Sequence, residues 1–282
     1  MIDIHTHPVV IEELIRDDPW LEHAIRDVFG LYITPQPLES FFLQMDVAEI
    51  DQAVLLPIDC TSTFGCCIVT NEQVAALAEK YPRFIGFASV DPHRKDAVSI
   101  LEHAINVLGL RGLKLDPSLQ YFHPNDRTYA YPLYEVCAEL KVPVLMHLGL
   151  SWSPRGSASY ARPLHLEDVL QDFPNLPIII AHFGWPWVEE ALMLALKYPN
   201  AYLDTSITFS GTPSDALQHV LAKQIGCDIL ERSLRNQILF GSNFPRAESI
   251  KRVRRAISNL YLTPALEHRI LQDNADRLLA RG

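Results

Sequence analysis

Two histidines and a carboxylate alternate in the first seven residues, MIDIHTH. Successive side chains of a β-strand point to opposite faces, so Asp3, His5 and His7 are predicted to share one face. A single histidine at a strand end is usually a hydrogen-bonded core residue, and an HxH pair can arise by chance among eleven histidines. Imidazole is also a common ligand of zinc and related ions. The two histidines therefore indicate a metal site only if the fold brings further ligands close to them.

Further polar side chains lie at the ends of short apolar runs, which are typical of buried strands. Lys114 lies in such a run, and His147, His182 and Asn243 stand at or near the ends of others. Segments with a helical period separate the runs, at 70–81, 96–108, 131–140, 187–198 and 247–260, and a last helical stretch follows. The eight runs are MIDIHTH (1–7), QAVLLPI (52–58), FIGFASV (84–90), LRGLKL (110–115), VPVLMHL (142–148), LPIIIAH (176–182), AYLDTSI (201–207) and QILFGSN (237–243).

Eight alternations of strand and helix predict an α/β fold, a (β/α)8 TIM barrel. Parallel neighbours need crossover connections, and eight such units close a barrel. An open doubly wound sheet is the alternative, but no glycine-rich phosphate loop follows the first strand. Residues 8–50 are too long for one crossover helix and are predicted to form a helical flap near the mouth. We expect residues 1–282 to form one domain.

The carboxyl ends of barrel strands meet at one mouth, where the active sites of this fold lie. Closure of the barrel brings the histidines of strands one, five and six to that mouth. Three protein ligands with an open fourth position are typical of a catalytic zinc ion. We therefore interpret His5, His7 and His147 as ligands of one divalent ion such as zinc, manganese or iron. Asp3 is expected to support the site or to reach the ion itself.

The composition argues against several classes of protein. Lys and Arg total 24 against 34 Asp and Glu, a formal charge of −10. This balance disfavours a broad nucleic-acid surface or a contact with anionic membranes, and the basic run at 246–256 is interpreted as a solvated helix face. Five cysteines without zinc-finger or redox spacing and an N-terminus without a secretory signal favour a cytoplasmic protein. No apolar run is long enough to span a bilayer.

Six motifs follow one another along nearly the whole chain: DIHTHP, GLRGLKLDPSLQYFHPND, YPLYEVCAELKVPVLMHLG, IIIAHFGWPW, ILFGSNFP and LQDNADRLL. Together they resemble successive landmarks of the amidohydrolase superfamily, in the amidohydrolase-2 branch that contains aminocarboxymuconate-semialdehyde decarboxylase and related metal-dependent hydrolases. Their order and spacing are more specific than any single motif. The resemblance implies a distorted barrel with one divalent metal ion, usually zinc and sometimes manganese, a small-molecule substrate and a possible homodimer.

The resemblance also implies a role for each strand-end residue. His5 and His7 would bind the metal from strand one, and His147 would bind it from strand five. His182 would act on the substrate or its activated water, as a hydrogen-bond donor or proton shuttle. Lys114 stands where some superfamily members carry a carbamylated lysine. In this branch the lysine is usually unmodified, so we expect a free ammonium that neutralises substrate charge.

The chain departs from the family pattern at the eighth strand. The family has an aspartate in GSD, as metal ligand and proton acceptor, whereas this chain reads FGSNFP with Asn243. An amide oxygen can coordinate a metal or accept a hydrogen bond, but it cannot be a general base near neutral pH. Three explanations stay open: an engineered inactivation, a lineage whose chemistry needs no base there, or a loss of catalysis.

The predicted function is a metal-dependent hydrolase that uses metal-activated water on a small carboxylated or cyclic substrate, at an ester, lactone or amide bond. Nonoxidative decarboxylation of a ring or unsaturated acid is the alternative, and a catalytically impaired metal-binding barrel is the third interpretation. His182, Asn243 and Lys114 are the candidate catalytic residues, with Asn243 also a candidate ligand. The candidate substrate contacts are Arg155, Trp152, Trp185, Arg246 and His123.

Overall fold

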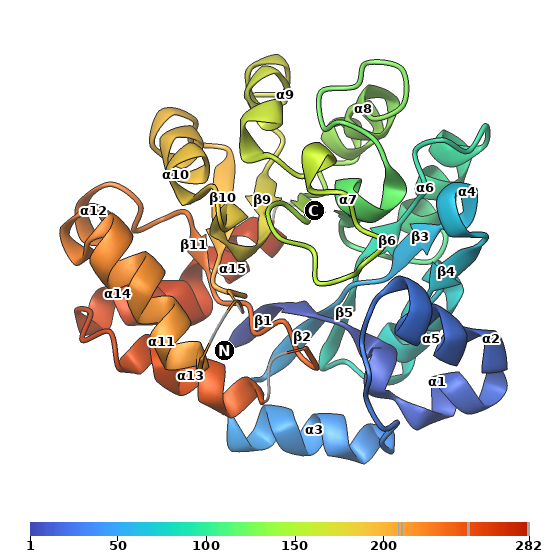
Figure 1. Cartoon of the computed structure of the whole chain (residues 1–282), viewed down its shortest axis with the longest axis horizontal. Coiled ribbons are helices and arrows are strands. Elements are labelled where there is room, and N and C mark those ends of the chain that lie inside the picture. The colour runs from blue at the N-terminus through green and yellow to red at the C-terminus, as the bar shows by residue number, and fades with distance from the viewer. Residues whose placement is uncertain (208, 210, 247–248, 281–282) are drawn as a thin grey trace.

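The strands close into a barrel with the helices outside it (Figure 1). The structure is a computed structural model, and it describes residues 1–207, 209, 211–246 and 249–280. The barrel strands of this part of the chain are β1 (Ile2–Thr6), β2 (Gln52–Leu55), β5 (Phe84–Gly86) with β6 (Ala88–Ser89), β7 (Leu113–Leu115), β8 (Val144–Met146), β9 (Ile178–Ile180), β10 (Ala201–Asp204) and β11 (Ile238–Leu239).

Parallel pairing joins these strands in sequence order, as β1-β2-β5 and as β6 to β11. Only Phe87 separates β5 from β6, and its backbone N donates to Leu55 O, so the two segments continue one strand. The barrel closes between β11 and β1, where Ile4 N donates to Phe240 O at 2.8 Å. The predicted (β/α)8 barrel and its eight strand positions are confirmed.

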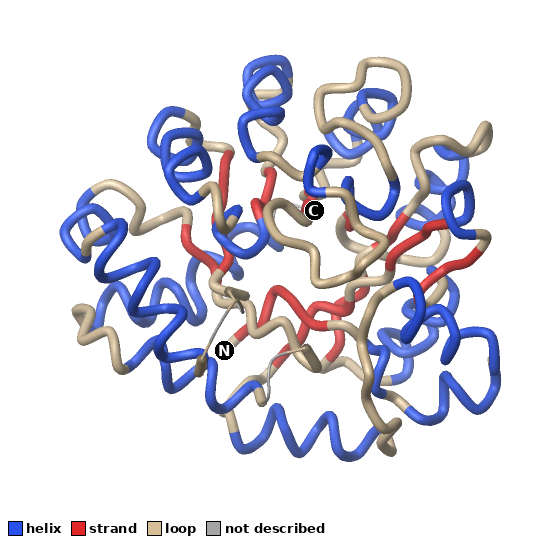
Figure 2. The backbone as a smooth tube through the Cα atoms, in the orientation of Figure 1, coloured by secondary structure: helices blue, strands red, loops and turns tan. Residues whose placement is uncertain are grey.

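The helices surround the strands (Figure 2). Helix α5 (Asn71–Lys80) begins with a capping box, because the Thr70 hydroxyl accepts from Gln73 N and the Gln73 side chain accepts from Thr70 N. The predicted helix at 247–260 is observed as α13 (Ile250–Ser258), and the first two predicted positions lie outside the described residues. The helices on the barrel wall include α5 (Asn71–Lys80), α6 (Ala97–Asn106), α8 (Tyr131–Glu139), α9 (Glu167–Asp172), α10 (Val188–Lys197), α11 (Pro213–Leu217), α12 (Cys227–Arg232), α13 (Ile250–Ser258), α14 (Pro264–His268) and α15 (Asn274–Leu279).

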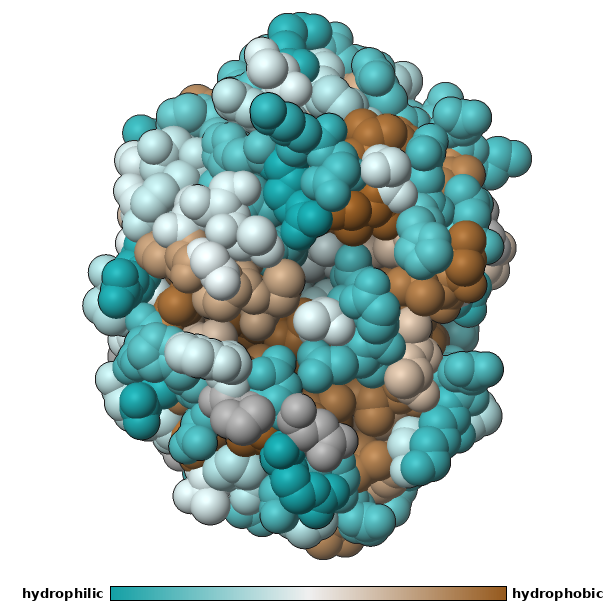
Figure 3. Space-filling view, turned by 90° about the vertical axis from the view of Figure 1, so that its right-hand side faces the viewer, coloured by the Kyte–Doolittle hydropathy of each residue, from teal (hydrophilic) through white to brown (hydrophobic). Residues whose placement is uncertain are grey.

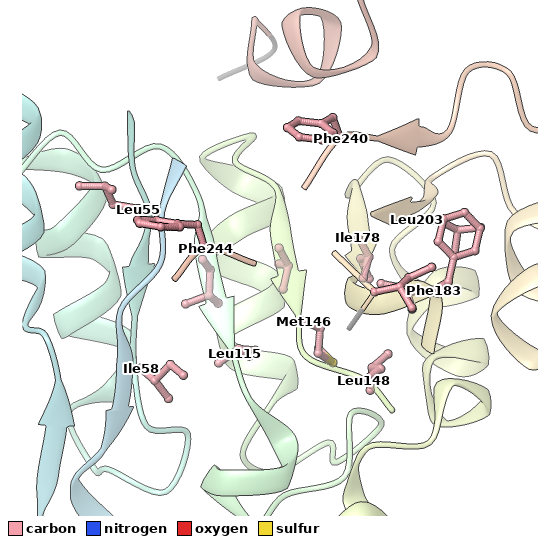
Figure 4. Close-up of a cluster of buried hydrophobic side chains, with 14 of the residues drawn as sticks. Leu55, Ile58, Leu115, Met146, Leu148, Ile178, Phe183, Leu203, Phe240 and Phe244 are labelled. Atoms are coloured by element: carbon pink, nitrogen blue, oxygen red, sulfur yellow. The ribbon is translucent and has the colours of Figure 1, made fainter. Parts of the chain in front are cut away.

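Two apolar layers follow from the alternation of side chains along the strands. The outer layer packs the strands against the helices, and Figure 4 shows part of it, with Leu55 from β2 and Met146 from β8. The inner layer fills the barrel with residues such as Val54 and Leu145, and Leu278 of α15 belongs to it. The polar residues discussed below lie above this inner layer, at the carboxyl ends of the strands.

The segment between β1 and β2 is helical, with α1 (Glu12–Asp17), α2 (Pro19–His23), a π-helical turn η2 (Ala24–Val28) and α3 (Leu38–Val47). Helix α3 packs against α13. The role of residues 8–50 as a flap stays a prediction. An antiparallel hairpin, β3 (Ile58–Cys60) and β4 (Cys66–Ile68), follows β2, with α4 (Thr61–Phe64) in its turn.

The face in Figure 3 is largely hydrophilic, with hydrophobic areas that polar side chains separate. Among the described helices, none combines the length and the apolar character that a membrane span requires.

Gly149 in the loop after β8 is a site where an added methyl group should be costly. Its φ is +102°, and a Cβ there would lie 2.1 Å from Trp185 O. We expect Gly149→Ala to lower the free energy of unfolding by about 3 kcal/mol, from left-handed backbone strain and overpacking together. The control is Gly109→Ala, because Gly109 also has a positive φ, of +70°, but a Cβ there would meet no atom of the described residues within 4 Å, so the change should cost about 1 kcal/mol. Urea denaturation measures both values, and equal losses would contradict the steric argument.

Candidate functional site

A β-bulge in β1 aims the two histidines of the first strand into the barrel. Asp3 pairs with Ala53 while Thr6 pairs with Leu55, so β1 has one residue more than β2 between these pairs. Ala53 belongs to the outer apolar layer, whereas Ile4 belongs to the inner one. Asp3 therefore lies on the outer face, and the prediction that it shares the face of the histidines is wrong.

Asp3 instead ties β1 to the loop after β11. Its Oδ1 accepts from the backbone N of His5 at 3.1 Å and of Ser242 at 2.9 Å. Burial raises the pKa of Asp3 to about 7. Its position fits a role in holding the strand that carries the histidines.

His5 and His7 present one ring nitrogen each toward the same point. His7 Nδ1 donates to Leu56 O at 2.9 Å, and His5 Nδ1 donates to Asp204 Oδ2 at 2.8 Å. Each Nε2 therefore carries a lone pair, and the two Nε2 atoms are 3.3 Å apart. Two nitrogen ligands of a tetrahedral zinc ion are about 3.3 Å apart, given zinc–nitrogen bonds of about 2.0–2.1 Å. Burial lowers the pKa of both imidazoles, so both are neutral, as ligands must be.

His147 brings a third acceptor nitrogen from the end of β8. His182 Nδ1 donates to Ser206 O at 2.8 Å, so His182 Nε2 accepts, and His147 Nδ1 donates to it at 3.0 Å. His147 Nε2 then carries a lone pair, and it is buried with no hydrogen-bond partner in the described part of the chain. A buried polar atom without a partner is costly. A divalent ion would satisfy this nitrogen, so the imidazoles at the mouth fit such an ion.

A carboxylate of β10 orients these rings. Asp204 Oδ2 holds His5, and Asp204 Oδ1 accepts from the backbone N of His182 at 2.8 Å. Among the described residues, His5, His182 and Asp204 form the group whose ligand atoms all lie within 4.8 Å of one another, whereas the predicted ligands His5, His7 and His147 do not form such a group. Because the facing atoms of His5 and Asp204 already share a hydrogen bond, we interpret Asp204 as the residue that orients His5 rather than as a ligand. Its place at a strand end was the sequence signal that could have found it.

Strained backbone marks the same region. His182 has φ +58° and ψ +23°, and Asn243 has φ +59°. Such left-handed conformations are uncommon outside glycine and concentrate at functional sites. Asn243 is buried, and its backbone N donates to His5 O at 2.9 Å. The strand-eight position that departs from the family pattern is therefore fixed directly beside the first histidine.

Lys114 is a buried ammonium at the cavity. Lys114 is 1% exposed. Burial lowers the pKa of Lys114 to about 8, while the nearby Asp116 and Asp204 raise it. Most of the lysine is therefore charged at neutral pH. A charge of this kind is suited to an anionic group that enters the cavity.

The cavity at the mouth has a volume of about 30 Å³. Most of the predicted site residues line it, while His5 contacts both His7 and His182 with ring centroids 5.2 and 4.9 Å apart. The lining also contains residues that no sequence pattern indicated, such as Phe29 from the segment after β1. The residues of the wall are His7, Phe29, Ile58, Lys114, Asp116, His147, Leu150, Ser151, Trp152, His182, Trp185, Ile207, Phe209, Asn243 and Arg246.

Two predicted substrate contacts lie elsewhere. Arg155 is exposed, and its guanidinium lies 5.7 Å from the Phe64 ring centroid, on a cleft between α2 and α4. His123 is also exposed and packs its ring on Tyr160 at 4.8 Å. Both residues stand in loops whose course the strand pattern does not determine. Neither belongs to the wall of the cavity, so we leave both out of the candidate site.

Replacing Asp204 tests whether it orients a metal ligand. We expect Asp204→Asn to weaken zinc binding by about 10- to 100-fold, because the amide no longer selects one tautomer of His5. Competition with a chromogenic chelator measures the dissociation constant. Asp168→Asn is the control, since Asp168 is exposed and its carboxylate accepts from Asn125 on the outside of the barrel. An unchanged dissociation constant in Asp204→Asn would contradict the assignment.

The chain matches the family model described as Amidohydrolase over residues 2–281. The 2-keto-4-carboxy-3-hexenedioate hydratase of Sphingobium sp. (strain NBRC 103272 / SYK-6) is 27% identical over 245 residues, which are 75% of this chain and 70% of that protein. A TIM-barrel protein of Bordetella bronchiseptica has a solved structure with a TM-score of 0.78 and 28% identity, and the match covers 100% of this chain and 98% of the other. The structure of 4-oxalomesaconate hydratase, LigJ, from Rhodopseudomonas palustris matches with a TM-score of 0.66 and 23% identity over 100% and 96% of the two chains.

Proposed function

Since this chain belongs to the amidohydrolase family, a family of metal-dependent enzymes, we propose that it is a hydrolase of a small carboxylated or cyclic substrate. The bond to be cleaved is an ester, lactone or amide bond. One observation carries the proposal: His7, His147 and Lys114 line the same cavity, and His147 Nε2 is buried without a hydrogen-bond partner among the described residues.

We assign the metal to His5, His7 and His147, with zinc preferred over manganese because neutral imidazole suits zinc well. A divalent ion held there would supply activated water and polarise a substrate carbonyl. Leu56 O and Asp204 support this assignment, since they fix the tautomers of His7 and His5. Asn243, whose backbone N donates to His5 O, is the candidate for an additional ligand through its amide oxygen.

Lys114 is assigned to a carboxylate of the substrate. Lys114 is buried and lines the cavity, and binding a carboxylate would compensate the burial of its charge. Trp152, which is half exposed, and Trp185 add apolar surface to the wall of the cavity. The Trp185 ring stacks on the Phe209 ring with centroids 4.2 Å apart, and this contact fixes the orientation of the Trp185 ring in the wall of the cavity.

His182 is assigned to a proton at the reacting centre. Its Nδ1–H is fixed on Ser206 O and its Nε2 accepts from His147 Nδ1, so His182 would take up a proton at Nε2 when the hydrogen bond from His147 opens. Asn243 can donate or accept a hydrogen bond, but it has no titratable lone pair for general-base work. Hydrolysis by this chain is therefore expected to be slow for the family.

The test combines metal analysis with a substrate screen. We expect about one zinc or manganese ion per chain, and metal-dependent release of acid from carboxylated lactones, esters or amides. Chelation should abolish this turnover, and added metal should restore it. Lys114→Met should raise KM at least tenfold for a carboxylated substrate and less for an uncharged analogue. A folded protein that binds no divalent ion would overturn the proposal.

Two other chemistries are outcomes of the same screen. The Sphingobium relative is a hydratase, so unsaturated dicarboxylic acids are included to detect addition of water to a double bond. Release of CO2 from ring or unsaturated acids, without hydrolysis, would favour the decarboxylase alternative. Stoichiometric metal with no turnover of any of these classes would favour the impaired metal-binding barrel.

A further inference from the structure

Three consecutive backbone carbonyls of the segment after β1 are bound by side chains from two loops of the barrel mouth. We call Val28, Phe29 and Gly30 the strap. Ser153, in the loop after β8, donates its hydroxyl to Val28 O. Arg246, in the loop after β11, donates Nη2 to Phe29 O at 2.8 Å and Nη1 to Gly30 O at 3.5 Å. The strap thus joins two loops that follow candidate metal ligands.

The strap also packs directly on the candidate metal site. The Phe29 ring lies edge to face against His7, with centroids 5.0 Å apart, and lines the cavity. The Arg246 guanidinium carbon lies 4.5 Å from the same ring centroid. One aromatic side chain is therefore held between the guanidinium and a candidate ligand.

Close approach fixes the path of the strap. Gly30 has φ +70°, and a Cβ there would lie 3.0 Å from Ser153 Cα. Only glycine combines this backbone conformation with such a close contact at little cost. The backbone of the strap therefore packs directly against the backbone of the loop after β8, with no space between them for a side chain at residue 30.

We propose that Arg246 is a positioning residue, which clamps the strap so that Phe29 walls the cavity and supports the ring of His7. This assignment replaces the expected role of Arg246 as an anion contact, because the guanidinium group of Arg246 already donates to two backbone carbonyls and lies over the Phe29 ring. Lysine cannot reproduce this arrangement, since an ammonium is a point charge without a planar fork. The kinetic part of the inference rests on the proposed function, whereas the structural part does not.

The first test is hydrogen exchange of the strap. The amides of Phe29 and Leu31 donate to Ala24 O and Ile25 O, so their exchange reports opening of this segment. We expect Arg246→Gln to speed exchange of both amides about tenfold or more, and Ser153→Ala to do so as well, because each removes an anchor. Arg246→Lys should lie between wild type and Arg246→Gln. The control is Arg127→Gln, since Arg127 is exposed and pairs with Asp172 outside the cavity.

The second test separates positioning from substrate contact. In Arg246→Gln we expect zinc affinity to fall about 10-fold, as for the loss of a residue that supports a ligand. We also expect KM to rise by the same factor for substrates with and without a carboxylate. A loss confined to carboxylated substrates, with unchanged exchange in the strap, would overturn the proposal and return Arg246 to anion binding. Unchanged exchange and unchanged zinc affinity would overturn it as well. If the protein turns over no substrate, the exchange and zinc measurements still decide the role of Arg246, whereas the proposed hydrolase fails.

Discussion

Replacing Asn243 by aspartate is expected to raise kcat for hydrolysis by about 10²- to 10⁴-fold, the usual contribution of one acid–base group. Asn243 lines the cavity beside His7 and His147, and its backbone is bonded to His5. A carboxylate there would add a proton acceptor that the amide cannot provide. The measurement is kcat and KM on the substrate that the screen identifies, at fixed metal saturation.

The substitution should fit the site without rearrangement. Asn243 has φ +59°, and Asp and Asn are the side chains that best tolerate this conformation after glycine. The two side chains also have nearly the same shape. A buried carboxylate next to imidazoles needs the metal or Lys114 to compensate its charge, so the metal-free variant should be less stable than the metal-free wild type. Asn243→Ala is the control, because it removes the amide without adding a base and should not gain activity.

An unchanged kcat in Asn243→Asp would remove the base from the mechanism. The third explanation of Asn243, a chain that has lost catalysis, makes a different prediction: the aspartate should then create turnover where wild type shows none. A lineage that needs no base there predicts that the aspartate changes little or slows the reaction. The variant therefore separates two of the interpretations that the sequence alone leaves open.

The barrel could be predicted because each strand is a local signal. Runs such as LPIIIAH are apolar, short and bounded by turn residues, and the observed β9 (Ile178–Ile180) lies within its run. The bulge in β1 could not be predicted in this way. It depends on the pairing of Asp3 with Ala53 and of Thr6 with Leu55, and register is a property of two strands that lie far apart in sequence. The one-face prediction for Asp3 failed for this reason.

The site residues at strand ends could likewise be predicted, whereas those in loops could not. His147, His182 and Lys114 come together at the cavity because barrel closure determines where strand ends lie. Arg155 follows β8 by several residues, and the geometry of its loop carries it to the surface. Phe29 could not be found, since an aromatic residue in a helical segment is typical of packing, and only the tertiary contacts of the strap place it on His7.

Zinc should stabilise the wild-type protein and should fail to stabilise His7→Ala. At about 1,000 times the dissociation constant, a ligand that binds only the folded state adds about 4 kcal/mol to the free energy of unfolding. For a chain of this size we expect a rise in Tm of roughly 8 °C. Differential scanning calorimetry with and without zinc measures the shift.

The comparison must use the zinc-induced shift rather than Tm itself. His7→Ala also leaves Leu56 O without its donor and removes the ring that Phe29 packs on, so the metal-free variant loses stability for reasons unrelated to the ion. Subtracting the metal-free Tm of each variant cancels that loss. His103→Ala, on the exposed face of α6, controls for zinc bound by surface histidines and should keep the full shift. If His7→Ala kept the shift as well, the ion would be bound elsewhere, and the case for a metal held by the first and fifth barrel strands would fail.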